Sequence, residues 1–245
     1  MQTTNPRHLF HIHWSKVVTV ILLFVSMTAA AQKNRGNYNY LDFQQKPYYF
    51  GITLAYNSAD YKIFRSKKFI AHDSIAIVND VNGPGFNLGI VSNLKIGEYF
   101  DLRFLPTLSF AERDISYEWS NPKKRPETFK IESITAELPF HIRYKSAPYH
   151  DIRLFVIAGA KYSFDVASNT RTRQADEIIK ISPTDFAIEY GAGIQFFFPY
   201  FIFSPEFKIS QGIGNLLLYN DKLEESTVLE KIFSRSFTFS FHFEG

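Results

Sequence analysis

The stretch Ser234–Phe243, SRSFTFSFHF, decides the fold class of this chain. Phenylalanine occupies every second position from Phe237 to Phe243, and serine, threonine or histidine stands between. Alternation with a period of two is typical of a β-strand whose faces meet different surroundings. An aromatic face and a polar face fit lipid outside and a polar lumen inside. Because a strand in lipid must pair its backbone groups on both edges, this stretch predicts a closed barrel.

The composition of the chain agrees with this interpretation. Its 245 residues fit one domain, and a mean hydropathy of -0.15 with 17% aromatic residues suits a barrel, whereas a helical membrane protein would be far more hydropathic. The chain has no cysteine, which excludes disulfides, thiolate chemistry and a lipoprotein anchor. The 27 Lys and Arg residues fall to 25 without Arg7 and Lys16, against 24 acidic residues. This near neutrality gives no support to a nucleic-acid partner.

Three regions are expected along the chain. Residues 1–31 resemble a secretory signal peptide, with a basic front, an apolar core at Val17–Met27 and an A-x-A site at Ala29 and Ala31. A retained helix is the alternative, although the apolar run is shorter than the roughly 20 residues that span a bilayer. Residues 32–47 are polar and are expected to form a periplasmic extension without fixed structure of its own. Residues 48–245 form the barrel.

Seven further segments alternate as the last one does. They lie at 48–57, 86–94 (opened by Gly83-Pro84-Gly85), 101–119 with a possible bulge at 112–114, 131–144, 152–165, 186–198 and 201–210. The connections between them are long and short in strict alternation. The sequence therefore predicts an all-β protein, an eight-stranded antiparallel transmembrane outer-membrane β-barrel with short periplasmic turns, longer surface loops and both termini in the periplasm. A soluble β-sandwich or lipocalin-like barrel is the alternative, but the charges here lie on the polar face and the other face is almost free of them.

The charged residues of the polar faces should point into the lumen. They are Arg103, Glu137, Arg143, Lys161, Glu189, Glu206 and Lys208. The interior of an eight-stranded barrel is narrow enough to be filled by side chains, so these charges are expected to pair with one another. We therefore expect no open pore. His141 and His242 are interpreted as hydrogen-bonded residues of this interior, with a ligand role as the alternative.

Two groups of residues are candidates for contact with a partner protein. Pro106, Pro139 and Pro205 lie inside predicted strands, where a missing N–H removes a ladder hydrogen bond, so bulges or kinks are expected there. A kinked wall could dock another membrane protein, or barrel closure alone could require it. The second group lies in the N-terminal extension and consists of Tyr38, Tyr40 and Phe43.

No stretch matches a nucleotide-binding loop, a zinc cluster or a nucleophile elbow, so we expect no catalytic residue, metal or cofactor. His72, Asp73 and Ser74 are residue types of hydrolases, but adjacent residues cannot form a triad with one another. Three expected surface loops carry basic clusters that either bind lipopolysaccharide phosphates or an acidic partner, or keep the loops soluble. The clusters are Arg65, Lys67 and Lys68; Lys123, Lys124 and Arg125; and Arg171 and Arg173.

Four stretches resemble a known family. They are FDLRFLPTLSF (100–110), ELPFHIRYKS (137–146), VIAGAKYSFD (156–165) and the long run at 185–217 that contains FSPEFKISQG. They are similar to the PorT-type outer-membrane barrels of the type IX secretion system. The resemblance implies a non-enzymatic component needed for export and maturation of cargo with a C-terminal sorting domain. Its partners would be outer-membrane lipid and other envelope proteins of that system. The alternatives are an outer-membrane lipid-modifying enzyme and a small ligand-binding or adhesin barrel.

Overall fold

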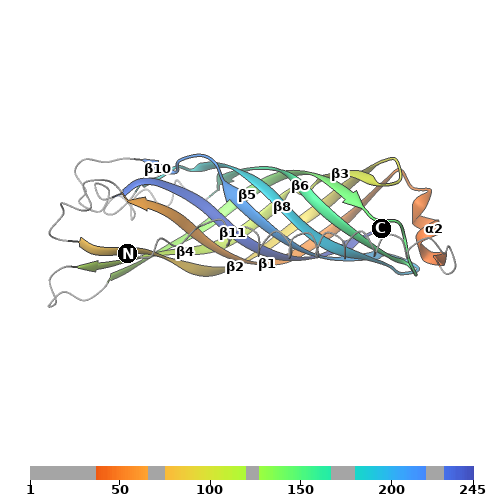
Figure 1. The fold of residues 1–245 in the computed structure, drawn as a ribbon, viewed down its shortest axis with the longest axis horizontal. Coiled ribbons are helices and arrows are strands. Elements are labelled where there is room, and N and C mark those ends of the chain that lie inside the picture. The colour runs from red at the N-terminus through yellow and green to blue at the C-terminus, as the bar shows by residue number, and fades with distance from the viewer. Residues whose placement is uncertain (1–36, 66–74, 120–126, 167–179, 219–228) are drawn as a thin grey trace, which may run out of the picture.

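The structure, a computed structural model, describes residues 37–65, 75–119, 127–166, 180–218 and 229–245. These residues form a short helix and a set of strands (Figure 1). The elements are α2 (Tyr38–Gln44), β1 (Tyr48–Arg65), β2 (Ile75–Ile96), β3 (Phe100–Phe104), β4 (Thr107–Trp119), β5 (Glu127–Lys145), β6 (Ile152–Asp165), β7 (Lys180–Ile181), β8 (Thr184–Phe197), β9 (Ile202–Gly212), β10 (Leu217–Leu218) and β11 (Leu229–Glu244).

The large sheet closes into a ring of eight antiparallel positions. Its order is β1-β11-β9-β8-β6-β5, then β3 and β4 in one shared position, then β2, which pairs with β1 again. The ladder between β1 and β11 runs from Gly51 opposite Glu244 towards the loops. The short strands β7 and β10 pair separately. The eight-stranded antiparallel barrel predicted from the alternation is confirmed.

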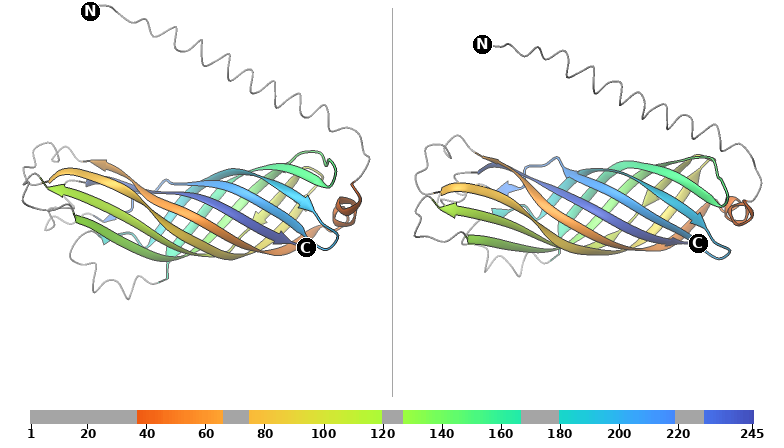
Figure 2. Two further views of the ribbon diagram at one scale, coloured as in Figure 1. Left: turned by 90° about the horizontal axis from the view of Figure 1, so that it is seen from below. Right: turned by 60° about the horizontal axis from the view of Figure 1, so that its bottom comes forward.

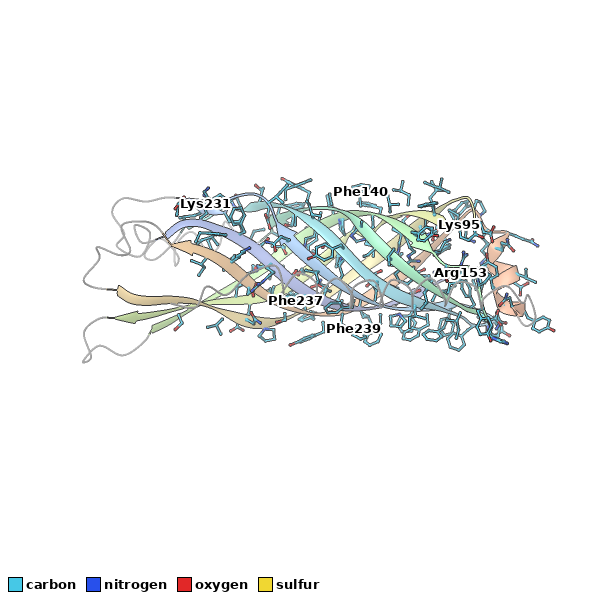
Figure 3. The ribbon with its side chains drawn as sticks, in the orientation of Figure 1. Lys95, Phe140, Arg153, Lys231, Phe237 and Phe239 are labelled. Atoms are coloured by element: carbon cyan, nitrogen blue, oxygen red, sulfur yellow. The ribbon has the colours of Figure 1, made fainter. Side chains whose placement is uncertain are left out.

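The two faces of each strand are those expected from the sequence. In β11 the side chains of Phe239 and Phe241 are exposed on the outside, whereas Thr238, Ser240 and His242 are buried inside. The same division holds along β1, where Ile52 and Leu54 face outward and Thr53 faces inward. Aromatic and aliphatic side chains therefore cover the outer surface, and Figure 3 shows them projecting outward along the barrel in one view.

Strands β1 and β2 are longer than the alternation predicted. β1 continues to Arg65 and β2 begins at Ile75, so Gly83 and Pro84 lie within a strand and do not open it. Both of these residues oppose the single residue Glu112 of β4, which makes a bulge in β2. The bulge that the sequence suggested at Glu112–Asp114 thus lies on the facing strand. The bulge lies at Pro84 because proline has no N–H to donate to the ladder, so displacing it breaks no hydrogen bond of its own N–H.

The prediction of an N-terminal extension without fixed structure is wrong for its second half, because residues 38–44 form the helix α2 across one end of the barrel (Figures 1 and 2). Tyr40 and Phe43 are three positions apart and therefore lie on one face of the helix. They pack against Tyr49, Phe197 and Ile202 of the barrel wall in one buried apolar cluster. The C-terminus lies at this same end, which we call the α2 end.

The sheet is interrupted at two of the three prolines, Pro106 and Pro205. β3 ends at Phe104 and β4 begins at Thr107, so Pro106 lies in the gap, where its carbonyl still accepts the N–H of Ile90 at 3.0 Å. The ladder between β8 and β9 is likewise broken next to Pro205. Pro139 lies in an unbroken strand opposite the first gap, and its carbonyl accepts the N–H of Leu105 at 3.2 Å. The ladder is thus interrupted at Pro106 and beside Pro205, whereas the strand that contains Pro139 continues unbroken, against expectation.

Candidate functional site

The seven charged residues that the sequence assigned to the lumen are all buried inside the barrel. They come from β3, β5, β6, β8 and β9, on strand faces that alternate with the lipid-facing residues. The structure adds further buried charges to this interior, among them Asp101, Lys145, Arg153 and Glu244. Glu244 follows the quoted stretch of β11 on the same even-numbered face as Thr238, Ser240 and His242, and this parity is the signal that would have placed it in the lumen.

One group of lumen charges is organised by two arginines. Arg103 donates hydrogen bonds to Glu206 at 3.0 Å and to Glu244 at 2.5 Å. Arg143 shares the same Glu244 oxygen at 3.4 Å and also donates to the hydroxyl of Tyr49 at 3.4 Å. Both arginines are fully buried. Such cations are tolerated in a low-dielectric interior only because carboxylates contact them directly.

A second group is organised by Glu189. Its carboxylate lies 2.6 Å from Nε2 of His141, 3.0 Å from Nζ of Lys208 and 3.4 Å from Nζ of Lys161. Lys161 also donates to Glu137 at 2.9 Å. His242 lies 3.6 Å from Glu206, the carboxylate that Arg103 also contacts. The histidine environments are thus those of an ion-pair network, and the described residues contain no group of three or more potential metal ligands.

Ten of the buried lumen charges form ion pairs with one another. They are five carboxylates and five Lys and Arg side chains: Asp101, Glu137, Glu189, Glu206 and Glu244 with Arg103, Arg143, Lys145, Lys161 and Lys208. A narrow lumen crossed by such pairs is filled by its own side chains.

The candidate partner residues of the extension divide into two kinds. Tyr38 is 80% exposed, whereas Tyr40 and Phe43 are 6% and 4% exposed because they pack on the barrel. Tyr40 contacts the ring of Phe197 edge to face at 5.2 Å. Burial raises the pKa of the Tyr40 hydroxyl, while the Arg153 guanidinium opposes the shift. In this arrangement only Tyr38 of the three is available to a partner.

The candidate prolines also differ in position. Pro205 is half-buried and alternates with the buried residues Ser204 and Glu206, so it lies on the outer face of β9. Pro106 is half-buried in the gap between β3 and β4. Pro139 is buried and lies on the lumen face with Glu137 and His141. Of the three, Pro139 has no surface to offer a neighbouring membrane protein.

Several residues considered in the sequence lie outside the described ranges. His72, Asp73 and Ser74, on which the lipid-enzyme alternative rests, are among them, as are the basic clusters apart from Arg65, the last residue of β1. The signal peptide of residues 1–31 is outside them too. In the part of the chain that the structure describes, no helix is long and apolar enough to cross a membrane.

A comparison with known protein families finds a match that covers most of the chain. The family described as an outer membrane protein beta-barrel domain matches residues 30–218. The chain belongs to this family. This outer-membrane barrel is accordingly a protein of the bacterial outer membrane, as its alternating strands predicted. A search of the curated proteins finds no match to the sequence.

Solved structures similar to this outer-membrane barrel are distant in sequence. The Neisserial surface protein A is 12% identical, with a TM-score of 0.44 over 81% of this chain and 97% of that one. OprG from Pseudomonas aeruginosa is 10% identical, with a TM-score of 0.44 over 81% and 95%. Ail, the attachment invasion locus protein of Yersinia pestis, is 13% identical, with a TM-score of 0.34 over 82% and 100%.

Proposed function

We propose that this outer-membrane barrel is a non-enzymatic component of the type IX protein secretion system, needed for export and maturation of cargo with a C-terminal sorting domain. The observation that carries the proposal is the resemblance of four stretches to PorT-type barrels. Those stretches coincide with the strands that build the lumen, since they contribute Arg103, Glu137, Arg143, Lys161, Glu189, Glu206 and Lys208. The resemblance thus covers the interior that defines this barrel.

The filled lumen supports a function in which the barrel acts through contacts made by its outer surfaces. A barrel whose interior is occupied by paired charges offers neither a wide channel nor a reaction centre within the described residues. We place the α2 end in the periplasm, because the short connections of outer-membrane barrels lie on that side. The surfaces available to other envelope proteins of the system would then be Tyr38 at the α2 end and the outer wall near Pro106 and Pro205.

Two experiments test this function together. The gene is deleted, secretion of sorting-domain cargo is measured, and the defect is complemented with the intact gene. In parallel, the protein carrying a tag after Gly245 is extracted in mild detergent, and co-eluting proteins are identified by mass spectrometry. We expect loss of cargo secretion and co-elution of envelope proteins of the system in fixed ratio. Elution of the barrel alone, with secretion intact after deletion, would refute the proposal.

A further inference from the structure

A cavity of about 200 Å³ lies at the α2 end, between the helix and the filled part of the lumen. Its lining combines residues of α2 with residues of the barrel wall, among them Tyr40, Tyr49, Lys95, Lys145, Arg153 and Gln195. Since a water molecule occupies about 30 Å³ of liquid, the cavity has room for a small polyatomic ion with a few waters. Figure 3 shows Lys95 and Arg153 at this end of the barrel, beside α2.

Two of these cations differ from those deeper in the lumen, because neither has a carboxylate partner in the described residues. Arg153 is 2% exposed, and its nitrogens donate to the carbonyl of Ser146 at 2.8 Å, the hydroxyl of Tyr40 at 3.1 Å and the carbonyl of Glu98 at 3.1 Å. Lys95 donates to the carbonyl of Phe43. All of these acceptors are neutral.

The other charges at the cavity do not neutralise this pair. Lys145 is itself a cation and lies 2.5 Å from Asp101. The Asp101 carboxylate therefore neutralises Lys145 and not Arg153 or Lys95. Glu98 also lines the cavity, but its side chain is exposed and makes no ion pair with Arg153 or Lys95. Arg153 is a buried cation without a carboxylate partner, which is costly, and Lys95 in the same cavity is half-buried. Elsewhere in this barrel every buried lumen cation contacts a carboxylate. The cavity is therefore built for an anion.

A further polar group indicates which anion. Gln195 is 1% exposed, lines the cavity and has an amide oxygen without a hydrogen-bond partner. That oxygen needs a donor, and phosphate near neutral pH carries a hydroxyl that sulfate lacks. A guanidinium and an ammonium suit the phosphate oxygens, since arginine binds them through two N–H groups and lysine as a point charge. A site with a buried acceptor discriminates against a ligand that leaves it unpaired.

We propose that this cavity, covered by α2, binds a phosphate group through Arg153 and Lys95, with Gln195 accepting a hydrogen bond from the phosphate hydroxyl. The group would be free phosphate or the phosphomonoester headgroup of a lipid such as phosphatidic acid, which present the same chemistry. This site stands independently of the proposed secretion role, because it rests only on the charges and the cavity of the barrel itself.

The test uses the whole barrel, folded in a nonionic detergent in buffer without phosphate. Inorganic phosphate and sulfate are titrated by calorimetry, and short-chain phosphatidic acid is titrated in a second arm. We expect saturable binding of phosphate at one site and at least tenfold weaker binding of sulfate. Lys95→Gln should weaken phosphate binding at least tenfold, whereas Lys62→Gln, an exposed lysine near the far end of β1, should leave it unchanged.

The lipid arm identifies the source of the group. Binding of phosphatidic acid that competes with phosphate and is weakened by Lys95→Gln assigns a headgroup site, and phosphate binding without such competition assigns a solute site. Lys95 is preferred to Arg153 because Arg153 also holds Tyr40 of α2. Folding of each variant is checked by its heat-dependent gel mobility. The proposal is overturned if neither probe binds, or if the folded Lys95→Gln and Lys62→Gln proteins bind phosphate equally.

Discussion

The carboxylate of Asp151, in the turn between β5 and β6, accepts a hydrogen bond of 2.9 Å from the backbone N–H of Tyr40. The other carboxylate oxygen of Asp151 accepts a hydrogen bond of 3.3 Å from the side-chain amide of Asn39. The backbone N–H of Asp151 donates to the side-chain oxygen of Asn37 at 3.1 Å. The N-cap residue Asn37 makes no side-chain capping bond within α2. A residue of the barrel wall therefore caps the helix. A helix of seven residues is too short to persist alone, so this contact helps to keep α2 in place.

Replacing Asp151 should release the start of α2. Asp151→Gly removes the carboxylate but keeps the positive φ of 57° that the turn requires. Loss of a helix cap costs about 1 kcal/mol, so we expect amide hydrogen exchange at residues 38–44 to become about five- to tenfold faster. His150→Gly, at the neighbouring position with a φ of 48°, is the matched control and should leave exchange in α2 unchanged. Equal exchange in both variants would contradict the capping role.

Tyr38 and Tyr40 should have separate effects. Tyr40→Ala removes a side chain that is 6% exposed together with its hydrogen bond to Arg153, so we expect the barrel to lose about 3 kcal/mol or more of unfolding free energy. Tyr38→Ala, at a position 80% exposed, should leave stability within about 0.5 kcal/mol and reduce co-purification of envelope partners. Urea unfolding and the tagged pull-down measure the two effects. Unchanged partners after Tyr38→Ala would remove Tyr38 from the interface.

Glu189 should be the most sensitive carboxylate of the lumen. Glu189→Gln removes the charge that faces His141, Lys161 and Lys208 and leaves buried cations in excess. Breaking a buried ion pair costs about 3–5 kcal/mol. Glu230→Gln is the matched control, because Glu230 is exposed and lies 4.0 Å from Lys231, a surface pair worth under about 1 kcal/mol. Denaturant unfolding in detergent compares the two, and similar losses would show that the network contributes little.

The filled lumen should not conduct ions steadily. In planar bilayers we expect the purified barrel to give no stable open steps, because Arg103, Arg143 and Glu244 occupy its cross-section. A double variant, Arg143→Ala with Glu244→Ala, removes a cation and an anion together and should raise the conductance measurably. Stable steps from the unchanged protein would show instead that the side chains rearrange to open a path.

Substitutions of the prolines should distinguish a role in barrel architecture from a role in partner binding. Pro205 lies on the outer face of β9 and Pro139 on the lumen face of β5. If the outer wall docks a partner, Pro205→Ala should reduce co-purification at least severalfold while changing unfolding free energy by under about 1 kcal/mol. Pro139→Ala should leave co-purification unchanged. The same pull-down measures both variants, and an equal yield from the two would leave barrel closure as the reason for the interrupted ladder at Pro205.

Most of the barrel follows from one physical rule, the alternation of lipid-facing and lumen-facing side chains. That rule placed Phe239 and Phe241 outside and Arg103, His141 and Glu189 inside, because each neighbouring environment excludes the wrong residue type. The alternation rule failed for the parts of strands outside the membrane, where lipid on one face and a polar lumen on the other no longer differ. β1 and β2 therefore extend past the residues at which their alternation fades.

The helix α2 was missed for a different reason. Its two anchoring residues, Tyr40 and Phe43, are separated by one helical turn, but seven residues are too few for a periodic signal to stand out. Its stability comes from Asp151 and Phe197, more than a hundred positions away along the chain. The uncompensated charge at Lys95 and Arg153 was likewise invisible, since it depends on which carboxylates the fold brings near.

The pairing of Gly51 with Glu244 joins strands from the two ends of the barrel sequence. This contact spans nearly the whole barrel sequence, and non-local contacts form late and slowly in folding. Glu244 also supplies the carboxylate that Arg103 and Arg143 share. The step that seals the wall is thus the step that neutralises the two buried arginines. Before β11 pairs with its neighbours, the sheet has unpaired strand edges, exposed aromatic side chains and two buried arginines without the Glu244 carboxylate. A partly assembled barrel therefore gains little stability. We expect insertion into the membrane to be a single cooperative event.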